Sequence, residues 1–325
     1  MKILYSVQAT GNGHISRAHQ LYPHLSQLGQ VDIMLSGCNA TLAMDIPVKF
    51  KSKGLSLFYS KCGGLDYKKM WAACNFKDIK RDIRDLPVEN YDLIINDFDY
   101  VTARACKQKK ISSIQFGHQA SFKSNYTPRP HAKSIVGELI LRHYAPATKN
   151  IGLHFDSYDS FVFPPIIKSD FLNSKPADHG HITVYLPAYQ TECIEKILKY
   201  VAPREVHWFL PEIKTPFKKE NITYFPVEQK YFNDSLIYCH GLLTGGGFET
   251  PAEALYMGKK ILTIPIDGQY EQQCNAAALE KMGVVKLPFL NSDTKSVFYN
   301  WVYGVKAVPR IKANDIPETL RYMMA

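Results

Sequence analysis

Cysteine patterns that would indicate a disulfide framework or a zinc site are missing from this sequence. The seven cysteines are an odd number, and no two of them form a C-x-x-C pair. Small secreted domains depend on paired cysteines, and zinc sites and redox motifs commonly use C-x-x-C spacing. We therefore expect a protein of the reducing cytoplasm that has no metal site.

Long hydrophobic runs are missing as well. A transmembrane helix needs about 20 consecutive apolar residues, and no stretch of the sequence reaches that length. The apolar stretch near the N-terminus, residues 3–7, is shorter than the core of a secretory signal peptide. We expect a soluble protein, or one that binds a membrane only peripherally.

Acidic residues are nearly absent from one long segment. Residues 100–155 contain nine Lys and Arg but a single acid, Glu138, and this surplus equals the whole net charge of +8 of residues 1–164. Residues 165–325 contribute only +1 of the total of +9. A local basic surface favours an anionic partner, although scattered solvated lysines would give the same count. Both interpretations stay open.

Strands and helices alternate along the 325 residues, a length typical of about two domains. We expect strands at 2–7, 31–35, 55–59, 91–96 and 111–116, and helices from about 14 to 30, within 67–85 and at 100–110. Such alternation predicts a doubly wound parallel α/β sheet. Pro23 falls inside the first helix, so we expect that helix to kink or to start late.

The pair Pro164-Pro165 predicts a stiff connector between two domains, residues 1–164 and 165–325. After it the alternation restarts. We expect strands at 181–186, 205–210, 221–225, 238–243 and 261–264, a helix at 191–201, and a mostly helical tail at 294–325. The second half therefore predicts another doubly wound sheet.

A glycine-rich turn in the second half carries the clearest chemistry. Gly245-Gly246-Gly247 follow a short apolar strand and precede a helix. Glycine amides and a helix N-terminus together make an anion site. Glu253 lies one turn into that helix, and Glu271 and Gln272 open the next one. The glycine-rich turn would bind phosphate, Glu253 would bind two neighbouring hydroxyls, and Glu271 with Gln272 would bind further hydroxyls. This combination predicts a nucleotide-sugar pocket.

The segment 241–276 resembles the C-terminal half of GT-B glycosyltransferases, in the branch of the peptidoglycan lipid-linked GlcNAc transferase with its family 28-type C-terminal domain. It is most similar to short bacterial and archaeal members. The resemblance implies an acceptor-side domain and a donor domain, both Rossmann-like, facing across a cleft, with the C-terminal helix returning to the first. It assigns the donor diphosphate to Thr244, Gly245, Gly246, Gly247 and Thr250, the ribose to Glu253, and the sugar to Glu271, Gln272 and Asn275. Related families usually have Asp where Glu271 stands.

A second glycine-containing turn, Gly11-Asn12-Gly13-His14, follows the first strand. A dinucleotide fingerprint would need a third glycine where Ser16 stands, so that interpretation fails. The resemblance places this turn on the acceptor side of the cleft. His14 stands at a helix N-terminus, whose dipole favours the neutral, basic imidazole. We expect it to act as a base; the alternative is a capping or structural histidine.

Two further residues follow strands of the first half. Asp97 ends the strand 91–96 and could orient His14, as the acid does in His–Asp pairs. Some related plant transferases use such a dyad, although they match this region poorly. Asp97 could equally cap the next helix. A D-x-D metal motif also fits Asp97 and Asp99, but the predicted fold argues against it. His118 either faces the same cleft or is a loop histidine bonded to backbone.

The segment 131–144 has the pattern of an amphipathic helix. Ile135, Val136, Leu139 and Ile140 form one apolar stripe, and basic side chains surround it. Such a helix can dock on an anionic membrane surface. The commoner alternative is a helix whose apolar stripe faces the core.

These observations predict a glycosyltransferase that moves a sugar from a uridine-linked nucleotide donor to an acceptor hydroxyl. His14 would take the acceptor proton, and backbone amides rather than a metal would meet the diphosphate charge. We expect no cofactor and no nucleic acid partner. The acceptor would be lipid-linked or anionic, with residues 100–155 touching the inner face of a membrane. A nucleotide-sugar hydrolase or epimerase, and a non-catalytic nucleotide-sugar-binding protein, stay open as alternatives.

Overall fold

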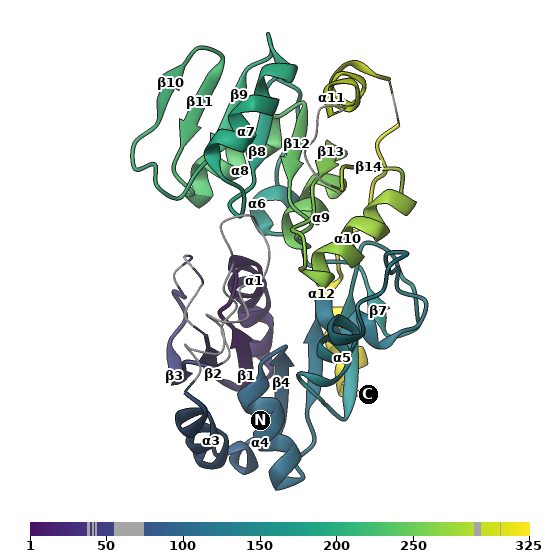
Figure 1. The fold of residues 1–325 in the computed structure, drawn as a ribbon. Coiled ribbons are helices and arrows are strands. Elements are labelled where there is room, and N and C mark those ends of the chain that lie inside the picture. The colour runs from purple at the N-terminus through teal and green to yellow at the C-terminus, as the bar shows by residue number, and fades with distance from the viewer. Residues whose placement is uncertain (38–39, 41, 43, 55–74, 289–293, 306) are drawn as a thin grey trace.

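The computed structural model describes residues 1–325 except 38–39, 41, 43, 55–74, 289–293 and 306. Two sheets lie one above the other, with the N-terminal sheet in the lower half of Figure 1. The strands of the first sheet are β1 (Lys2–Gln8), β2 (Gln30–Ser36), β3 (Val48–Ser52), β4 (Leu93–Asp97), β5 (Ile114–Gly117), β6 (Lys149–Leu153) and β7 (Val162–Phe163).

The second sheet repeats this design in the C-terminal half. Its strands are β8 (Ile182–Tyr185), β9 (Val206–Phe209), β10 (Phe217–Lys219), β11 (Ile222–Phe225), β12 (Gly241–Thr244), β13 (Lys260–Thr263) and β14 (Val285–Lys286). The strand orders in the described residues are β3-β2-β1-β4-β5-β6-β7 and β10-β11-β9-β8-β12-β13-β14. Every pairing is parallel except that of β10 with β11. The expected doubly wound α/β fold is confirmed.

Helices connect the parallel strands and cover the sheets. They are α1 (Asn12–Leu28), α3 (Phe76–Asp85), α4 (Tyr100–Lys109), α5 (Ile135–His143), α6 (Ser169–Leu172), α7 (Thr191–Leu198), α8 (Gln229–Tyr238), α9 (Glu249–Tyr256), α10 (Tyr270–Lys281), α11 (Thr294–Tyr303) and α12 (Ile316–Met324). Short 3₁₀ turns occur at Val88–Asn90, His118–Lys123 and Lys199–Val201. Parallel strands covered on both faces read as hydrophobic runs, and in β1 every residue after Lys2 is buried.

The strand orders decide where a ligand can bind. In an open parallel sheet, the crevice opens at the carboxyl ends of the strands where the order reverses. In the first sheet this point lies between β1 and β4, and in the second between β8 and β12. His14 lies in the first turn of α1, shortly after β1. Asp97 is the last residue of β4, and the three glycines directly follow β12. The fold therefore directs the predicted site residues toward the space between the sheets.

Several expected boundaries were wrong. Helix α1 begins at Asn12 and runs through Pro23, so the prediction of a late start was wrong. Leu21 and Leu25 are fully buried on either side of the proline, and their packing stabilises the helix although the proline lacks a backbone N–H. The strand expected at 238–243 begins only at Gly241, because α8 extends to Tyr238. The tail is mostly helical as expected, in α11 and α12, and the described residues between these two helices are not helical. The strand expected at 55–59, and the helix expected within 67–85 up to residue 74, lie outside the described residues.

The apolar stripe of α5 faces outward. Ile135, Val136, Leu139 and Ile140 are 80%, 58%, 55% and 42% exposed. The other side of the helix is buried, because Leu141 packs in a cluster with Phe122 and Tyr270. The alternative of a stripe facing the core was therefore wrong.

Helix α12 lies beside the first sheet, in yellow in the lower half of Figure 1. Leu320 and Met323 are buried there and belong to the same core cluster as Ile3 and Tyr5 of β1. Lys149 Nζ at the start of β6 donates to the carbonyl oxygens of two residues in the last turn of α12. The end of the chain therefore packs against the first sheet after completing the second.

Candidate active site

Two cavities lie side by side between the sheets. The first, here called the His14 cavity, measures about 210 Å³. Its lining from the first half of the chain includes Gly11, Gly13, His14, Arg17, His118 and Gln119, and from the second half Gly247, Phe248, Glu249, Glu271 and Gln272. The second, here called the Thr250 cavity, measures about 130 Å³ and is lined among others by Asn12, Gly13, Lys168, Tyr185, Glu228, Gln229, Glu249 and Thr250.

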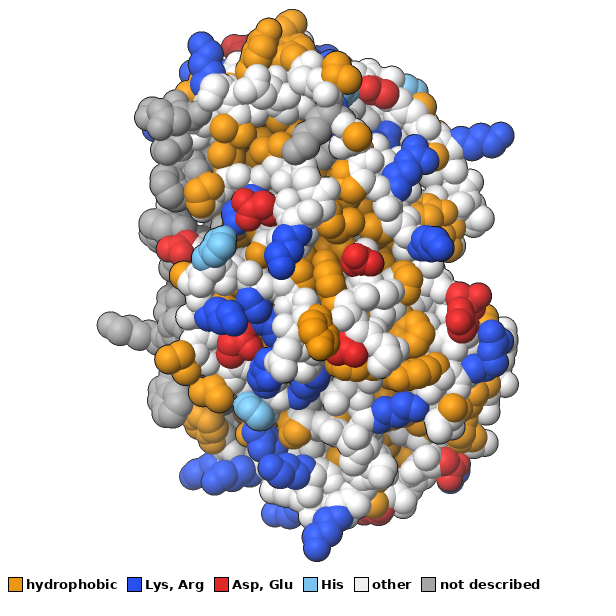
Figure 2. Space-filling view, turned by 90° about the vertical axis from the view of Figure 1, so that its right-hand side faces the viewer, with side chains coloured by type: hydrophobic (Ala, Val, Ile, Leu, Met, Phe, Trp, Pro, Cys, Tyr) orange, Lys and Arg blue, Asp and Glu red, His pale blue; other side chains and the backbone are white. Residues whose placement is uncertain are grey.

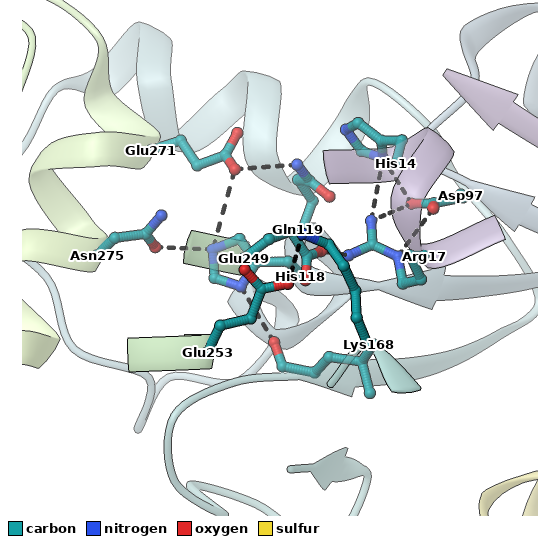
Figure 3. A network of polar contacts seen from close by, with 11 residues as sticks. His14, Arg17, Asp97, His118, Gln119, Lys168, Glu249, Glu253, Glu271 and Asn275 are labelled. Carbon is teal, nitrogen blue, oxygen red and sulfur yellow. Dashed lines mark hydrogen bonds and ion pairs between the residues drawn. The ribbon is translucent and has the colours of Figure 1, made fainter. Parts of the chain in front are cut away.

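His14 belongs to a largely buried polar network, in which it contacts Asp97 and Arg17 (Figure 3). Its Nδ1 is 2.9 Å from Asp97 Oδ1, and the carboxylate is fully buried. Arg17, one turn further along α1, donates from Nε and Nη2 to the two oxygens of Asp97, at 2.9 and 2.8 Å. Burial alone would raise the pKa of Asp97, but Arg17 and His14 hold it below its usual value. Asp97 is therefore a carboxylate that accepts from both partners.

The capping alternative for Asp97 is resolved by its neighbour. Asp99, not Asp97, is the N-cap of α4 and accepts from the backbone N–H groups of Val101 and Thr102. Because α4 already has its cap, the Asp97 side chain is left for His14 and Arg17. Gly117 at the end of β5 leaves room for it, since a Cβ there would come within 2.6 Å of Asp97 Oδ1.

Arg17 also joins the two halves of the chain. Its Nη1 donates to Glu249 Oε1, at the first position of α9. Burial would lower the pKa of the guanidinium, but Asp97 and Glu249 raise it, so Arg17 is a cation. Sequence reasoning missed both Arg17 and Glu249. The spacing of three residues between His14 and Arg17, which puts them on one helix face, was the available signal.

The glycine-rich turn is held from behind by α10. Gln272 Oε1 accepts from the backbone N–H groups of Gly246 and Ile266, at 3.0 and 3.1 Å. Asn275 is fully buried and donates from Nδ2 to the carbonyl oxygen of Gly246. Asn275 and Thr244 line neither cavity. Gln272 and Asn275 thus fix the shape of the turn, and Gly247 is exposed at its tip.

Glu253 is buried beside the Thr250 cavity and pairs with Lys168, which lies shortly after Pro164-Pro165. Its Oε1 lies 3.0 Å from Lys168 Nζ, and its side chain is 3% exposed. Burial raises the pKa of Glu253, and Lys168 opposes this shift. Glu253 Oε2 is buried and has no hydrogen-bond partner among the described residues. A buried carboxylate oxygen without a donor is costly, so this atom is suited to a ligand hydroxyl.

A family model described as glycosyl transferase family 1 matches residues 1–300. The chain belongs to glycosyl transferase family 1. It is therefore an enzyme that transfers a sugar from a nucleotide donor, and the hydrolase, epimerase and non-catalytic alternatives are set aside. None of the curated proteins that were compared with it matches.

Solved glycosyltransferases share the fold. Arabidopsis thaliana UGT89C1 in complex with quercetin is 14% identical, with a TM-score of 0.61 over 99% of this chain and 92% of that one. SnogD from Streptomyces nogalater is 14% identical, with a TM-score of 0.54 over 99% of both chains. Spinosyn forosaminyltransferase SpnP is 10% identical, with a TM-score of 0.55 over the full length of both. The GT-B fold expected from the sequence is confirmed.

Glu271 and His118 complete the His14 cavity of this glycosyltransferase. Gln119 Nε2 donates to Glu271 Oε1 at 2.9 Å, across the two halves of the chain. The ring of His118 stacks on Phe248 with centroids 3.9 Å apart, and its nitrogens lie 3.0 Å from Leu153 O and 2.7 Å from Asn275 Oδ1. Burial lowers the pKa of His118 to about 3, although these hydrogen bonds oppose the shift. His118 is thus a buried packing residue between the halves, with an acceptor oxygen facing each of its ring nitrogens.

The described residues lack both a metal-binding cluster and a membrane-spanning helix. They contain no group of three or more His, Cys, Asp and Glu side chains placed to hold a metal ion. Among their helices, none combines the length and apolar character that crossing a bilayer requires.

Glu249 gives the first testable prediction. Burial raises its pKa to about 7, because it outweighs the opposing Arg17, and the nearby Glu253 and Asp97 add to the rise. A folded-state pKa above the unfolded value of about 4.5 gives stability that is complete below pH 4.5 and is lost as pH rises through about 7. Glu249→Gln removes this titration. In thermal unfolding from pH 5 to pH 8, the Tm of Glu249→Gln minus that of the wild type should rise with pH. A difference that is independent of pH would contradict the assignment.

Proposed function

We propose that this glycosyltransferase uses a UDP-sugar and transfers the sugar to an acceptor hydroxyl, with His14 as the base. The observation that carries this proposal is the composition of the His14 cavity. It combines His14, held by Asp97, from the first half with Glu271 and the glycine-rich turn from the second. A base and a set of sugar ligands on opposite walls of one cavity are what sugar transfer to a hydroxyl requires.

The donor would extend through both cavities. Its ribose hydroxyls suit Glu253, whose Oε2 is buried without a partner among the described residues. Its diphosphate suits the amides of Gly245 and Gly247 and the N-terminus of α9, since the Gly246 N–H already donates to Gln272. Thr250 lines the cavity on the ribose side, and Glu271 reaches the sugar. The choice of uridine is supported by the same fold in the Arabidopsis protein, which has been solved with UDP and with UDP-L-rhamnose.

The chemistry needs one proton transfer. Nδ1 of His14 lies 2.9 Å from Asp97 Oδ1 and 3.0 Å from Nη2 of Arg17. The proposal requires the tautomer whose Nδ1–H donates to Asp97, because Nε2 of the ring is then the free base. It takes the proton from the acceptor hydroxyl while the hydroxyl oxygen bonds to the anomeric carbon. The bond between that carbon and the diphosphate oxygen breaks, and the backbone amides receive the charge. Thr244 and Asn275 then support the turn rather than touch the sugar.

We further propose that residues 1–164 and 165–325 are the acceptor-side and donor domains. Two separate sheets, which end at β7 and begin at β8, support this division. The glycine-rich motif supports placement in the branch of the peptidoglycan lipid-linked GlcNAc transferase. On that basis the acceptor is lipid-linked or anionic, and the enzyme works at the cytoplasmic face of a membrane.

Contact with a membrane is supported chiefly by α5, next to the cleft. Its exposed stripe of Ile135, Val136, Leu139 and Ile140 is an apolar surface of the first half. Lys and Arg gather in the lower half of the face in Figure 2, among hydrophobic side chains. Not all basic residues of segment 100–155 are available to a membrane, however. Arg129 is mostly buried against Glu138, and Lys123 donates to the carbonyl oxygen of Arg142, so they stabilise α5 from inside.

The base assignment predicts the effect of His14→Ala. The variant should lose about 10²–10⁴-fold in turnover, the usual contribution of a general base, and keep its donor affinity. Asp97→Asn should lose less if Asp97 only orients the ring. His24→Ala, on the same helix but outside both cavities, is the matched control. Release of UDP in the presence of acceptor is the measurement, and full activity of His14→Ala would remove it from the role of base.

The ribose assignment predicts the effect of Glu253→Ala. The variant should bind UDP more weakly by about 1–3 kcal/mol, the scale for losing a charged hydrogen-bond partner. Glu280→Gln, an exposed carboxyl near the end of α10, should leave the affinity unchanged. Isothermal titration calorimetry with UDP measures both. Equal affinity of Glu253→Ala and the wild type would exclude Glu253 from the ribose site.

The membrane assignment predicts flotation with vesicles. The full chain should float with anionic liposomes and not with neutral ones, and salt should weaken the binding. The double variant Ile135→Glu/Leu139→Glu should bind about tenfold less or worse, because each buried side chain contributes about 1.5–3 kcal/mol. Phe217→Glu, exposed on β10 of the other sheet, is the control. Equal binding to both vesicle types would contradict the role of anionic lipid, and binding to neither would indicate a soluble acceptor.

A further inference from the structure

The two cavities of the cleft share a wall made of two residues. Gly13 and Glu249 are the residues common to the linings of the His14 cavity and the Thr250 cavity. They are in close contact, since a Cβ added to Gly13 would come within 2.8 Å of Glu249 Cγ. Thr250 and the Glu253 partner Lys168 line one cavity and Glu271 lines the other, so the Glu249 side chain stands between the proposed ribose and sugar positions.

A nucleotide-sugar bound in both cavities has to cross this wall with its diphosphate. Glu249 follows directly after the glycine-rich turn, at the first position of α9, and its carboxylate lies where the helix dipole favours an anion. In the donor-free structure that anion is Glu249 itself. Two anions on the same few donors repel each other at a cost of several kcal/mol. The Glu249 carboxylate and the donor diphosphate therefore cannot both bind at the N-terminus of α9.

Glu249 forms an ion pair with Arg17. The guanidinium is 2% exposed and keeps two of its donor nitrogens on Asp97, so its orientation is fixed independently of Glu249. Its remaining nitrogen, Nη1, donates to Glu249 Oε1. If Glu249 moves away, Nη1 faces the gap between the cavities. A rigid guanidinium with one open donor edge is well matched to a phosphate oxygen.

We propose that Arg17 is a ligand of the donor diphosphate, supplied by the first half of the chain, and that Glu249 takes the place of this diphosphate until the donor displaces it. This inference rests on the proposed UDP-sugar donor. Arg17 then serves both reacting groups. It holds Asp97, the partner of His14, and it receives the diphosphate that leaves, so the base and the leaving group contact one guanidinium.

The test compares the affinities of UDP and uridine, because uridine lacks the diphosphate. Both are titrated calorimetrically at pH 8, where Glu249 is ionised, into the wild type, Glu249→Gln and Arg17→Gln. Glu249→Gln should bind UDP about three- to tenfold more tightly, because the competing charge is gone. Arg17→Gln should bind UDP at least about tenfold more weakly, the scale for losing a charge-assisted hydrogen bond. Uridine affinity should stay the same in both variants.

Controls separate this role from a structural one. If Arg17→Gln does not fold, Arg17→Lys serves instead, because it keeps a positive charge beside Asp97. It should also bind UDP more weakly, since one ammonium group cannot bridge Asp97 and the diphosphate. Arg142→Gln breaks an arginine–glutamate pair outside both cavities and should change nothing. Weaker UDP binding by Glu249→Gln, or equal changes in the affinities for UDP and uridine, would overturn this inference. The proposal that the donor is a UDP-sugar would still stand. No UDP binding by the wild type would overturn both.

Discussion

A buried guanidinium is the interaction on which the rest of this active site depends. Arg17 is almost completely removed from water, and a buried charge is tolerated only when it is paired and hydrogen-bonded. Asp97 satisfies it from the first sheet and Glu249 from the second half. Because these partners come from the carboxyl ends of two sheets, satisfying one cation brings the halves of the cleft together. Removing Arg17 would leave the buried Asp97 without its main cationic partner.

The architecture could be predicted from the sequence because its signal is local and repeated. Alternating apolar runs and helical segments gave most strands of both sheets, since buried parallel strands are hydrophobic along their length. Errors arose where tertiary packing decides. Pro23 does not delay α1, because Leu21 and Leu25 are buried on either side of it. The stripe of α5 has the pattern of a core helix, and only the fold determines which side of it is covered.

The site could be predicted only in part for a related reason. Glycines after a strand, and acids at helix starts, are visible in one stretch of sequence, so the donor motif was found. The pairing of Arg17 with Glu249, 232 residues apart, depends on how two sheets face each other and has no local signature. Asn275 shows the opposite case. Its position in a motif suggested contact with the sugar, but the structure directs it to the turn and to His118.

The central claim is that one nucleotide-sugar binds across both cavities, between the two sheets. A crystal structure of the full chain with bound UDP tests it most directly. The account predicts the ribose hydroxyls on Glu253, the diphosphate on the amides of Gly245 and Gly247, and Glu249 turned away from Arg17. UDP bound elsewhere on the protein, or bound here with the Arg17–Glu249 pair intact and the glycine-rich turn unoccupied, would contradict it.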